Sequence, residues 1–491
     1  MMLFMQAPHT KSEPTALVNM VNAGFWWCAA TVVLAASFFL FNLGGEAFFD
    51  YDEATYARVT VETQQSSDLM TLRLLDRPWF EKPPLYFWLS MFFAEIFPTP
   101  EFAYRFSSAL AGIGSIILVM LIAYHLTRRY PVACVSGLVL LFSPPFYEAA
   151  RQMRLDVPVT LTILIAFYAF LKGLERPRWM LGIGLSLAVG VMFKSIIAGL
   201  AAPIILIWAL VHRNFSWLKM PQLWIGAFLG AAIVAPWHVY ETMQHGATFW
   251  ASYLGEHVVN RFDSNILKGA STGSNMTYVS YLLQFALPWT VVFVAGLVPL
   301  AAQRDKEESR PLIGLAAAAL FILGIFLIAG TKISYYLTPM YPFIAMFIAI
   351  AGFAFYERIR GEAYVVGFHF IALIVVGIAI ANTIFVGFHH QHQLAYNYAG
   401  AEAERTIGRI VAAAPADLAI YTYEWPYWET LRYYSGGRRI TGIEDDQILD
   451  RPFFLVIPSV IYAKNPFDPE LQSHFTMSTS TDILTLLMFT P

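Results

Sequence analysis

Long apolar segments, separated by shorter polar ones, occupy most of this chain. A helix needs about twenty apolar residues to cross a bilayer, and fewer where it packs inside a bundle. The pattern predicts eleven membrane-spanning helices, at residues 22–43, 104–125, 131–146, 156–172, 179–193, 195–211, 222–240, 277–301, 311–330, 333–355 and 363–387. We therefore expect an α-helical polytopic membrane protein. Its first span is expected to be uncleaved, because that apolar segment is too long for the core of a signal peptide.

Composition agrees with this class. Hydrophobic residues make up 57% of the 491 residues and charged residues 13%, whereas a soluble protein carries about 25% charged residues. The net charge of -3 gives no indication of a nucleic-acid partner. Cys28 and Cys134 both lie in apolar segments, which excludes a disulfide framework and a cysteine metal site. Phosphate-binding and dinucleotide-binding glycine motifs are missing, so nucleotide-driven chemistry is not supported.

Basic residues predict the orientation of the spans. With a cytoplasmic N-terminus, every inner loop is basic, and together these loops contain Arg128, Arg129, Lys172, Arg176, Arg178, Arg213, Lys219, Arg304, Lys306, Arg310, Arg358 and Arg360. The outer loop 44–103 is rich in acidic residues instead. Eleven spans then place the C-terminus on the outer side, together with the outer loops 44–103 and 241–276.

A change of composition near residue 388 predicts two domains. Residues 1–387 form the transmembrane domain, and residues 388–491 are expected to form a small α/β domain on the outer face. The second part contains helical patterns at 399–413 and 428–434 and strand patterns at 418–423 and 453–457. Loop 44–103 has two amphipathic segments of its own, at 53–65 and 84–97, the second of which suits the membrane interface.

Acidic residues follow the first span closely. Asp50, Asp52 and Glu53 lie within four residues of one another. A carboxylate at this place could take a proton from an acceptor hydroxyl or phosphate. Acids are also common as solvated loop charges, and they favour a helix N-terminus through its dipole. The spacing leaves these interpretations open.

The segment Phe80-Glu81-Lys82-Pro83-Pro84 is a more specific signal. Two prolines fix the backbone and favour the start of a helix directly after them. A lysine ahead of a helix start lies in positive potential that suits a phosphate. The alternative is a lysine that snorkels to the membrane interface.

Other charged residues lie at span ends on the same predicted face. Arg154 and Asp156 precede the fourth span, either as a structural ion pair or as a second carboxylate on the side of Asp52. Lys194 interrupts the apolar residues between the fifth and sixth spans and could equally mark a turn. Charge this close to the bilayer is costly and usually functional.

Two further segments carry candidate residues. In loop 241–276, His257 and Arg261 share a face if that segment is helical. His257 and Glu81 could together bind a divalent metal ion through nitrogen and oxygen, although a lone histidine is more often a surface residue. Lys332 and Tyr336 at the start of the tenth span fit an aromatic belt as well as they fit a site.

Taken together, these motifs resemble those of the membrane-embedded GT-C glycosyltransferases, and within them the aminoarabinose transferase branch, which is related to protein O-mannosyltransferases. The resemblance covers about residues 40–345. It rests on the order of Asp52-Glu53-Ala54-x-Tyr56-Ala57, Phe80-Glu81-Lys82-Pro83-Pro84-Leu85, Arg154-Leu155-Asp156-x-Pro158, Lys194, Pro236-Trp237, His257…Arg261-Phe262, Leu287-Pro288-Trp289 and Lys332…Tyr336-Leu337-x-Pro339-x-Tyr341-Pro342.

The resemblance implies an inverting transferase in the bacterial inner membrane with a periplasm-facing site. Its partners would be a sugar donor on polyprenyl (undecaprenyl) phosphate, a lipid or glycan acceptor, which in this branch is lipid A, and membrane lipids. By position it implies catalytic roles for Asp52 and Asp156, and substrate contacts for Lys82, Arg261, Tyr336, Arg58, Lys194 and Glu53. Glu81 and His257 match the place of a divalent metal ion such as Zn²⁺, Mg²⁺ or Mn²⁺.

Two departures leave the sugar and the acceptor open. The branch usually has more spans, and the C-terminal part of this chain matches no pattern of the family. A mannosyl- or uronosyl-transferase acting on protein or polysaccharide is therefore an alternative. A transporter or flippase of a lipid-linked sugar would use the same charged cavity, but the chain lacks the paired halves common in transporters. A structural scaffold would leave the loop acids unexplained.

Overall fold

The computed structural model describes residues 14–49, 52–260, 274–359, 361–389, 395–425, 429–443, 451–464, 466–467 and 469–491, and the side chains of 14–23, 257–258, 386–389, 395–399 and 469–470 also lie outside this description. The chain forms two compact units. The helical unit comprises Met1–Phe41, Phe80–Tyr86 and Phe106–Gly387. The mixed unit comprises Asn42–Trp79, Phe87–Arg105 and Phe388–Pro491, so it joins most of the expected first outer loop with the C-terminal segment.

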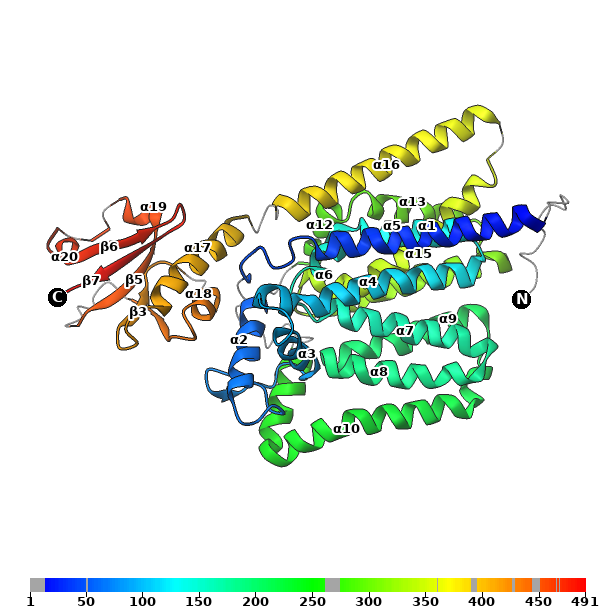
Figure 1. The fold of residues 1–491 in the computed structure, drawn as a ribbon. Coiled ribbons are helices and arrows are strands. Elements are labelled where there is room, and N and C mark those ends of the chain that lie inside the picture. The colour runs from blue at the N-terminus through cyan, green and yellow to red at the C-terminus, as the bar shows by residue number, and fades with distance from the viewer. Residues whose placement is uncertain are drawn as a thin grey trace. The chain divides into compact units, whose positions relative to one another are not determined.

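Apolar helices make up the helical unit (Figure 1). They are α1 (Pro14–Leu40), α4 (Pro100–Thr127, whose first turns belong to the mixed unit), α5 (Tyr130–Leu141), α6 (Pro144–Ala150), α7 (Asp156–Glu175), α8 (Leu181–Lys194), α9 (Ala201–His212), α10 (Pro221–Trp250), α12 (Met276–Phe285), α13 (Trp289–Ala301), α14 (Arg310–Ile328), α15 (Tyr341–Tyr356) and α16 (Glu362–His389). Short 3-10 helices include η1 (Pro177–Met180), η2 (Ser195–Leu200), η3 (Ser216–Lys219), η5 (Glu307–Ser309) and η6 (Ser334–Met340), and η4 (Ala251–Val259) is a π-helix.

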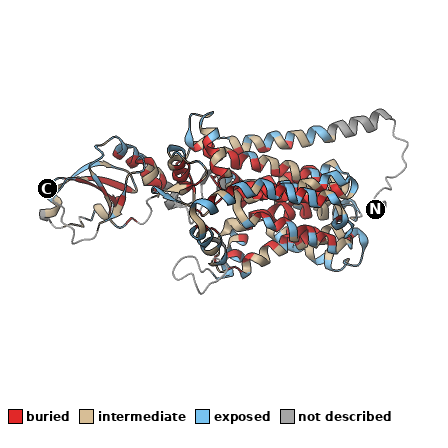
Figure 2. Ribbon diagram, turned by 90° about the horizontal axis from the view of Figure 1, so that it is seen from below, coloured by how far each residue is buried: buried red, intermediate tan, exposed pale blue. Residues whose placement is uncertain are grey.

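Close backbone contact joins α8 to α10, with α7 packed on the other side of α8. A Cβ atom on Gly184 would lie 2.1 Å from the carbonyl oxygen of Gly226, and one on Gly230 would lie 2.4 Å from that of Gly184. Small residues let apolar helices approach closely enough for their backbones to pack directly. Figure 2 shows the buried residues lining the interior of this helix bundle.

The predicted spans correspond to these helices, and the protein is a multi-pass membrane protein. The described residues contain seven helices that are long and apolar enough to cross a membrane, or up to nine if each of two bent helix pairs is one span. The shorter apolar helices Gly24–Leu40 and Leu85–Ala94 are additional to these. The predicted total of eleven is not confirmed, partly because residues 177–212, predicted as two spans, count as one apolar stretch of 36 residues.

Two spans predicted as continuous are broken. Segment 131–146 consists of α5 and α6, bent by 72°, and segment 277–301 consists of α12 and α13, bent by 106°. Pro144 and Pro145 open α6, and Pro288 precedes α13. Proline lacks the N–H that would continue the helical hydrogen bonds, which explains both breaks. Residues 241–250, expected in a loop, instead continue α10 beyond a kink at Gly246, whose φ is 55°.

In the mixed unit, α2 (Asp52–Gln65) and α3 (Leu85–Ala94, whose first two residues belong to the helical unit) match the two predicted amphipathic segments, and between them lies a hairpin of β1 (Arg73–Leu74) and β2 (Arg77–Pro78). The C-terminal part contains α17 (Ala395–Ala412), β3 (Ala419–Thr422), α18 (Glu429–Tyr434), β4 (Ile440–Gly442), β5 (Phe453–Pro458), α19 (Ser459–Tyr462), α20 (Pro469–Ser473), β6 (Phe475–Ser480) and β7 (Leu484–Phe489).

The C-terminal strands form one five-stranded sheet in the order β4-β3-β5-β7-β6. Strands β4, β3 and β5 are parallel, whereas β7 and β6 are antiparallel to their neighbours. Ile407 of α17 and Leu431 of α18 pack with Ile420, Val456 and Leu486 in a buried core. The predicted small α/β fold is therefore present, including the predicted β3 and β5, while β4, β6 and β7 were not predicted.

Candidate functional site

Three residues from separate sequence motifs meet in the helical unit. Asp156 is the first residue of α7, and Lys194 is the last residue of α8. Lys194 Nζ lies 2.5 Å from Asp156 Oδ1 and 5.4 Å from the centre of the Tyr336 ring. The two charged side chains are 11% and 8% exposed, so this ion pair is largely shielded from water. Ser195, with φ 50°, ends α8 directly after the lysine.

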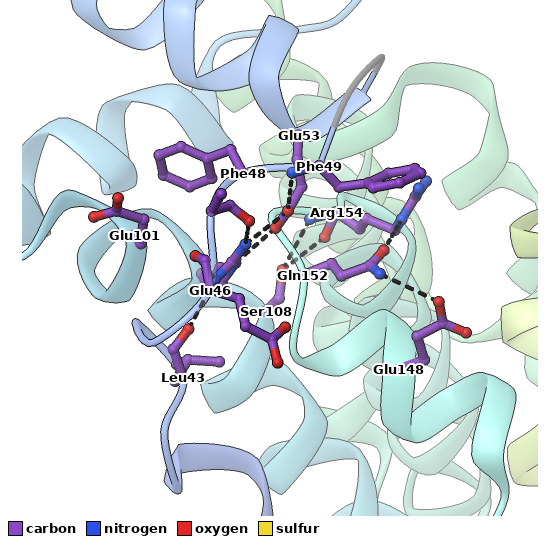
Figure 3. Close-up of polar contacts among 12 residues, drawn as sticks. Leu43, Glu46, Phe48, Phe49, Glu53, Glu101, Ser108, Glu148, Gln152 and Arg154 are labelled. Atoms are coloured by element: carbon purple, nitrogen blue, oxygen red, sulfur yellow. Dashed lines mark hydrogen bonds and ion pairs between the residues drawn. The ribbon is translucent and has the colours of Figure 1, made fainter. Parts of the chain in front are cut away.

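A chain of hydrogen bonds surrounds the residues next to this pair (Figure 3). Arg154 Nε donates to Gln152 Oε1 over 2.6 Å, and Gln152 Nε2 donates to Glu148 Oε1 over 3.2 Å. The guanidinium of Arg154 also lies 3.4 Å from the centre of the Tyr335 ring, and Tyr335 Oη donates to the same Glu148 oxygen over 3.0 Å. The network therefore fixes Arg154, two residues from Asp156, and Tyr335, the neighbour of Tyr336. Asp156 pairs with Lys194, whereas Arg154 stacks on Tyr335, so of the two open interpretations an Arg154–Asp156 ion pair is not the one that the structure shows.

Lys82 is buried at the entrance to α3. Its Nζ lies 2.6 Å from Glu81 Oε1, and Lys82 is only 6% exposed. The ring of Phe80 packs on His245 and Phe249 near the end of α10, with ring centres 5.0 and 5.5 Å away. A snorkelling lysine would hold its ammonium in water, so this burial favours the interpretation as part of a site. Helix α3 begins at Leu85, as the two prolines predict.

Lys332 has a local structural role. Its Nζ donates to the carbonyl oxygens of Phe326, Leu327 and Ala329, over 3.1, 2.7 and 2.5 Å. These carbonyls close the C-terminal end of α14, where a cation is favoured. Burial lowers the pKa of Lys332 below its ordinary value. Lys332 therefore stabilises the turn that leads into Tyr335 and Tyr336.

In the mixed unit, Glu53 organises the loop that precedes it (Figure 3). Arg105 Nε and Nη2 donate to the two carboxylate oxygens of Glu53, each over 2.8 Å, and the Phe49 N–H donates to Glu53 Oε2 over 2.9 Å. Arg105 also donates to the carbonyl oxygens of Leu43, Glu46 and Ala47. Glu53 is fully buried. The geometry gives it a positioning role, while its predicted contact with substrate stays a prediction.

Arg58 joins two distant parts of the mixed unit. Its Nη1 lies 3.1 Å from Glu429 Oε2 of α18, and its Nη2 pairs with Glu62, one turn further along α2. Arg58 is buried. It holds α2 against α18, and its predicted contact with substrate likewise stays a prediction.

The remaining predicted residues are placed only in part. Asp52 is the first residue of α2 and is partly exposed, at a helix start that favours an acid. The backbone of His257 lies in η4, but its side chain is outside the described residues, as are Asp50 and Arg261.

Comparisons with known proteins point to one kind of fold. The sequence profile described as dolichyl-phosphate-mannose-protein mannosyltransferase matches residues 81–240. The chain is 27% identical over 330 residues to the undecaprenyl phosphate-alpha-4-amino-4-deoxy-L-arabinose arabinosyl transferase of Erwinia tasmaniensis, and 28% identical over 335 residues to transferase 2 of that name in Proteus mirabilis. Among solved structures, ArnT from Cupriavidus metallidurans bound to undecaprenyl phosphate superposes with a TM-score of 0.69 at 17% identity.

The chain has the GT-C fold. Its predicted resemblance to aminoarabinose transferases is confirmed. The match to the Cupriavidus structure covers 94% of this chain and 98% of that one. The sequence matches cover 65% of this chain, and the chain spans 58% and 59% of the lengths of the Erwinia and Proteus relatives. An oligosaccharyltransferase from Archaeoglobus fulgidus shares the GT-C fold more distantly, with a TM-score of 0.54 at 12% identity.

Within this GT-C fold, Glu81 and His257 are the predicted metal ligands. The carboxylate of Glu81 forms an ion pair with Lys82, whose positive charge disfavours a second cation at the same oxygen. Among the described residues there is no group of three or more His, Cys, Asp and Glu side chains that could hold a metal ion. The described side chains therefore do not fit a metal site by themselves, and the predicted site at Glu81 and His257 stays a prediction.

Several partner residues around Asp156 and around Glu53 and Arg58 were not predicted. Glu148 falls just beyond a predicted span, and its only sequence signal was its position three residues before Arg151, as an acidic residue close to a basic one. Arg105 lies inside a predicted span, where an arginine is rare enough to indicate a buried partner. Glu429 carries no local signal, because its partner Arg58 lies 371 positions away along the chain.

Proposed function

We propose that this protein is an inverting glycosyltransferase that moves a sugar from undecaprenyl phosphate to lipid A, as in the transfer of 4-amino-4-deoxy-L-arabinose. The observation that carries the proposal is the shielded Asp156–Lys194 pair beside Tyr336. The proposal is supported by the names of the Erwinia and Proteus relatives and by the undecaprenyl phosphate bound to the Cupriavidus structure, whose fold this chain shares.

Cationic and hydroxyl groups act on the carrier phosphate in this mechanism. Lys82, Arg261 and Tyr336 bind the phosphate and stabilise the negative charge that grows on it as the bond to the anomeric carbon breaks. The polyprenyl phosphate leaves with the bonding electron pair. Lys194 holds Asp156 in place through their ion pair. Lys82 is only 6% exposed, and burial makes its electrostatic attraction to a phosphate stronger than it would be in bulk water.

Asp52 acts on the acceptor. Its carboxylate accepts the proton of an acceptor hydroxyl while the acceptor oxygen attacks the anomeric carbon. When the acceptor is a phosphate that is already ionised, Asp52 orients it instead. A single displacement inverts the anomeric configuration, whereas a retaining route requires a carboxylate nucleophile. Product NMR that shows the configuration of the donor retained would refute this mechanism.

The site faces the periplasm, and the protein lies in the bacterial inner membrane with residues 388–491 as a periplasmic domain. The basic residues of the loops 124–131, 172–180, 211–222, 302–311 and 356–363 support this orientation through the positive-inside rule. A protease added to the outside of spheroplasts should release fragments of the C-terminal domain. Cleavage found only in inside-out vesicles would reverse the orientation.

The direct test uses purified protein in detergent, a radiolabelled polyprenyl-phosphate aminoarabinose and lipid A. We expect label on lipid A with the wild type, loss of transfer in Asp52→Asn, and full transfer in the control Asp417→Asn, an exposed residue of the C-terminal domain. Label that stays on the carrier would refute this donor and acceptor pair. Mannosyl and uronosyl donors would then be tested, and movement of intact donor across liposomes would indicate a flippase.

Metal dependence is tested separately. Wild type and His257→Ala are purified, and their bound Zn, Mg and Mn are measured by elemental analysis before and after chelation. One bound ion in the wild type that is lost in the variant would support the predicted site, and equal metal content in both proteins would refute it.

A further inference from the structure

The backbone of Phe48 is held by two side chains of the C-terminal helix α18. Its N–H donates to Tyr434 Oη over 3.0 Å, and its carbonyl oxygen accepts a hydrogen bond from Thr430 Oγ1 over 3.1 Å. Thr430 and Tyr434 are four residues apart, so they lie on one face of α18. Phe48 is fully buried. Both backbone polar groups of the buried Phe48 are thus satisfied by a segment more than 380 residues away.

The ring of Phe48 is enclosed as well. Tyr433 meets it edge-on with ring centres 5.0 Å apart, and Tyr104 stacks on it at 5.7 Å. The guanidinium of Arg105 lies 5.2 Å from the same ring. Tyr434 Oη in turn donates to Glu101 Oε1 over 2.8 Å, which fixes the orientation of the hydroxyl that accepts from Phe48.

Helix α17 adds a second attachment to the same segment. Glu402 Oε1 accepts a hydrogen bond from the Ala47 N–H over 2.6 Å, and Arg405 Nη1 donates to the carbonyl oxygen of Gly45 over 3.4 Å. Residues 45–48 are therefore bonded to the C-terminal domain at three positions. Asp52 begins α2 only four residues after Phe48.

We propose that Thr430 and Tyr434 are positioning residues, which place residues 45–49 and, through the hydrogen bond from the Phe49 N–H to Glu53 Oε2, set the position of the neighbouring Asp52 carboxylate at the start of α2. The proposal rests on the catalytic role that the proposed function gives to Asp52. Breaking either hydrogen bond leaves a buried backbone group of Phe48 without that partner, so the segment shifts to regain one. Catalysis is sensitive to such shifts, because a displacement of about 1 Å can lower a rate by about 10²-fold.

The experiment compares Thr430→Val, Thr430→Ser and Tyr434→Phe with the wild type. Valine matches threonine in shape but lacks the hydroxyl, and serine restores the hydroxyl. The control Tyr421→Phe removes a hydroxyl from β3, where Tyr421 packs against Phe453 in the sheet. We expect Thr430→Val and Tyr434→Phe to lower kcat by about tenfold or more with KM for the donor within about twofold. Thr430→Ser and Tyr421→Phe should keep kcat within about twofold of the wild type.

A second measurement does not depend on activity. Hydrogen exchange of the amides at 47–49 should be at least about tenfold faster in Thr430→Val and Tyr434→Phe, and unchanged in Tyr421→Phe. An active wild type with unchanged kcat or unchanged exchange in both variants would overturn the inference alone. A rise in KM together with a fall in kcat that Thr430→Ser does not restore would overturn it too, because that pattern indicates general damage to the fold. A wild type that transfers no sugar would overturn the proposed function, and exchange would then decide whether α18 holds the segment.

Discussion

Replacing Arg105 with lysine keeps the charge but removes the geometry on which the mixed unit depends. The guanidinium makes five hydrogen bonds, two to the carboxylate of Glu53 and three to the carbonyl oxygens of Leu43, Glu46 and Ala47. A lysine ammonium has three donors. At least two of the five bonds are therefore lost in Arg105→Lys, even if every remaining donor finds its acceptor.

The expected loss follows from burial. The side chain of Arg105 is 4% exposed and that of Glu53 is 0% exposed, so water does not replace the missing donors. A hydrogen bond to a charged group contributes about 1.5–3 kcal/mol, so two lost bonds cost about 3 kcal/mol at the lower end. Because 1.4 kcal/mol is a factor of ten in an equilibrium constant, local opening of residues 43–49 should rise by about 10²-fold.

Native-state hydrogen exchange measures this opening directly. The Phe49 amide is the chosen probe, because it donates to Glu53 Oε2 over 2.9 Å. We expect its exchange to accelerate by about 10²-fold in Arg105→Lys. Arg358→Lys is the matched control, since Arg358 is exposed and bonds to the side chain of Gln303. Exchange of Phe49 within about twofold of the wild type would refute the reasoning, because the five bonds would then contribute nothing that lysine cannot supply.

Three further predictions concern the other ion pairs and Tyr434. Lys194→Gln should lower the free energy of unfolding in mixed micelles by about 3 kcal/mol, because it leaves the Asp156 carboxylate buried without its ammonium; an unchanged value would contradict the role of the pair. Glu429→Gln should lower stability by less than about 1 kcal/mol in thermal unfolding, because Glu429 is 27% exposed and Arg58 keeps its other partner. Burial and the carboxylate of Glu101 raise the pKa of Tyr434 well above its ordinary value, so the folded state keeps the phenol neutral while the unfolded chain ionises. Stability should therefore fall as pH rises above about 10, and Tyr434→Phe should lose that part of the fall in a comparison of unfolding at about pH 9 and 11.

The cluster around Asp156 was predictable because its members mark span ends. Asp156 begins the fourth predicted span, Lys194 directly follows the fifth, and Tyr336 lies near the start of the tenth. Successive spans alternate in direction, so the order of the spans places these three ends on one face. The structure brings them within contact distance. The alternation of the spans thus predicted that the three residues lie on the same side of the membrane, although the number of spans itself is not confirmed.

Partners far apart along the chain were not predictable in this way. Glu53 and Arg105 are 52 positions apart, and Arg58 and Glu429 are 371 positions apart. Hydrophobic periodicity describes neighbours one or two turns away, so it gives no information about such pairs. The broken spans were missed for a related reason, because apolar composition continues through Pro144 and Pro288 although the helical hydrogen bonds do not.

The neighbours Asp52 and Glu53 illustrate how one motif can hold two functions. Successive residues of an α-helix point about 100° apart, so adjacent carboxylates at the start of α2 cannot face the same surroundings. Glu53 turns into the mixed unit and binds Arg105, while Asp52 is partly exposed. A buried carboxylate held by a bidentate arginine is suited to fixing a loop, and a partly exposed one at a helix start is suited to meeting a substrate. Shortening Glu53 alone, in Glu53→Asp, keeps both charges and leaves Asp52 unchanged, but it shortens the carboxylate that must reach Arg105 and the Phe49 N–H. That variant should therefore lose activity through loosening of residues 43–49, seen as faster exchange at Phe49, although the acid at position 52 is intact.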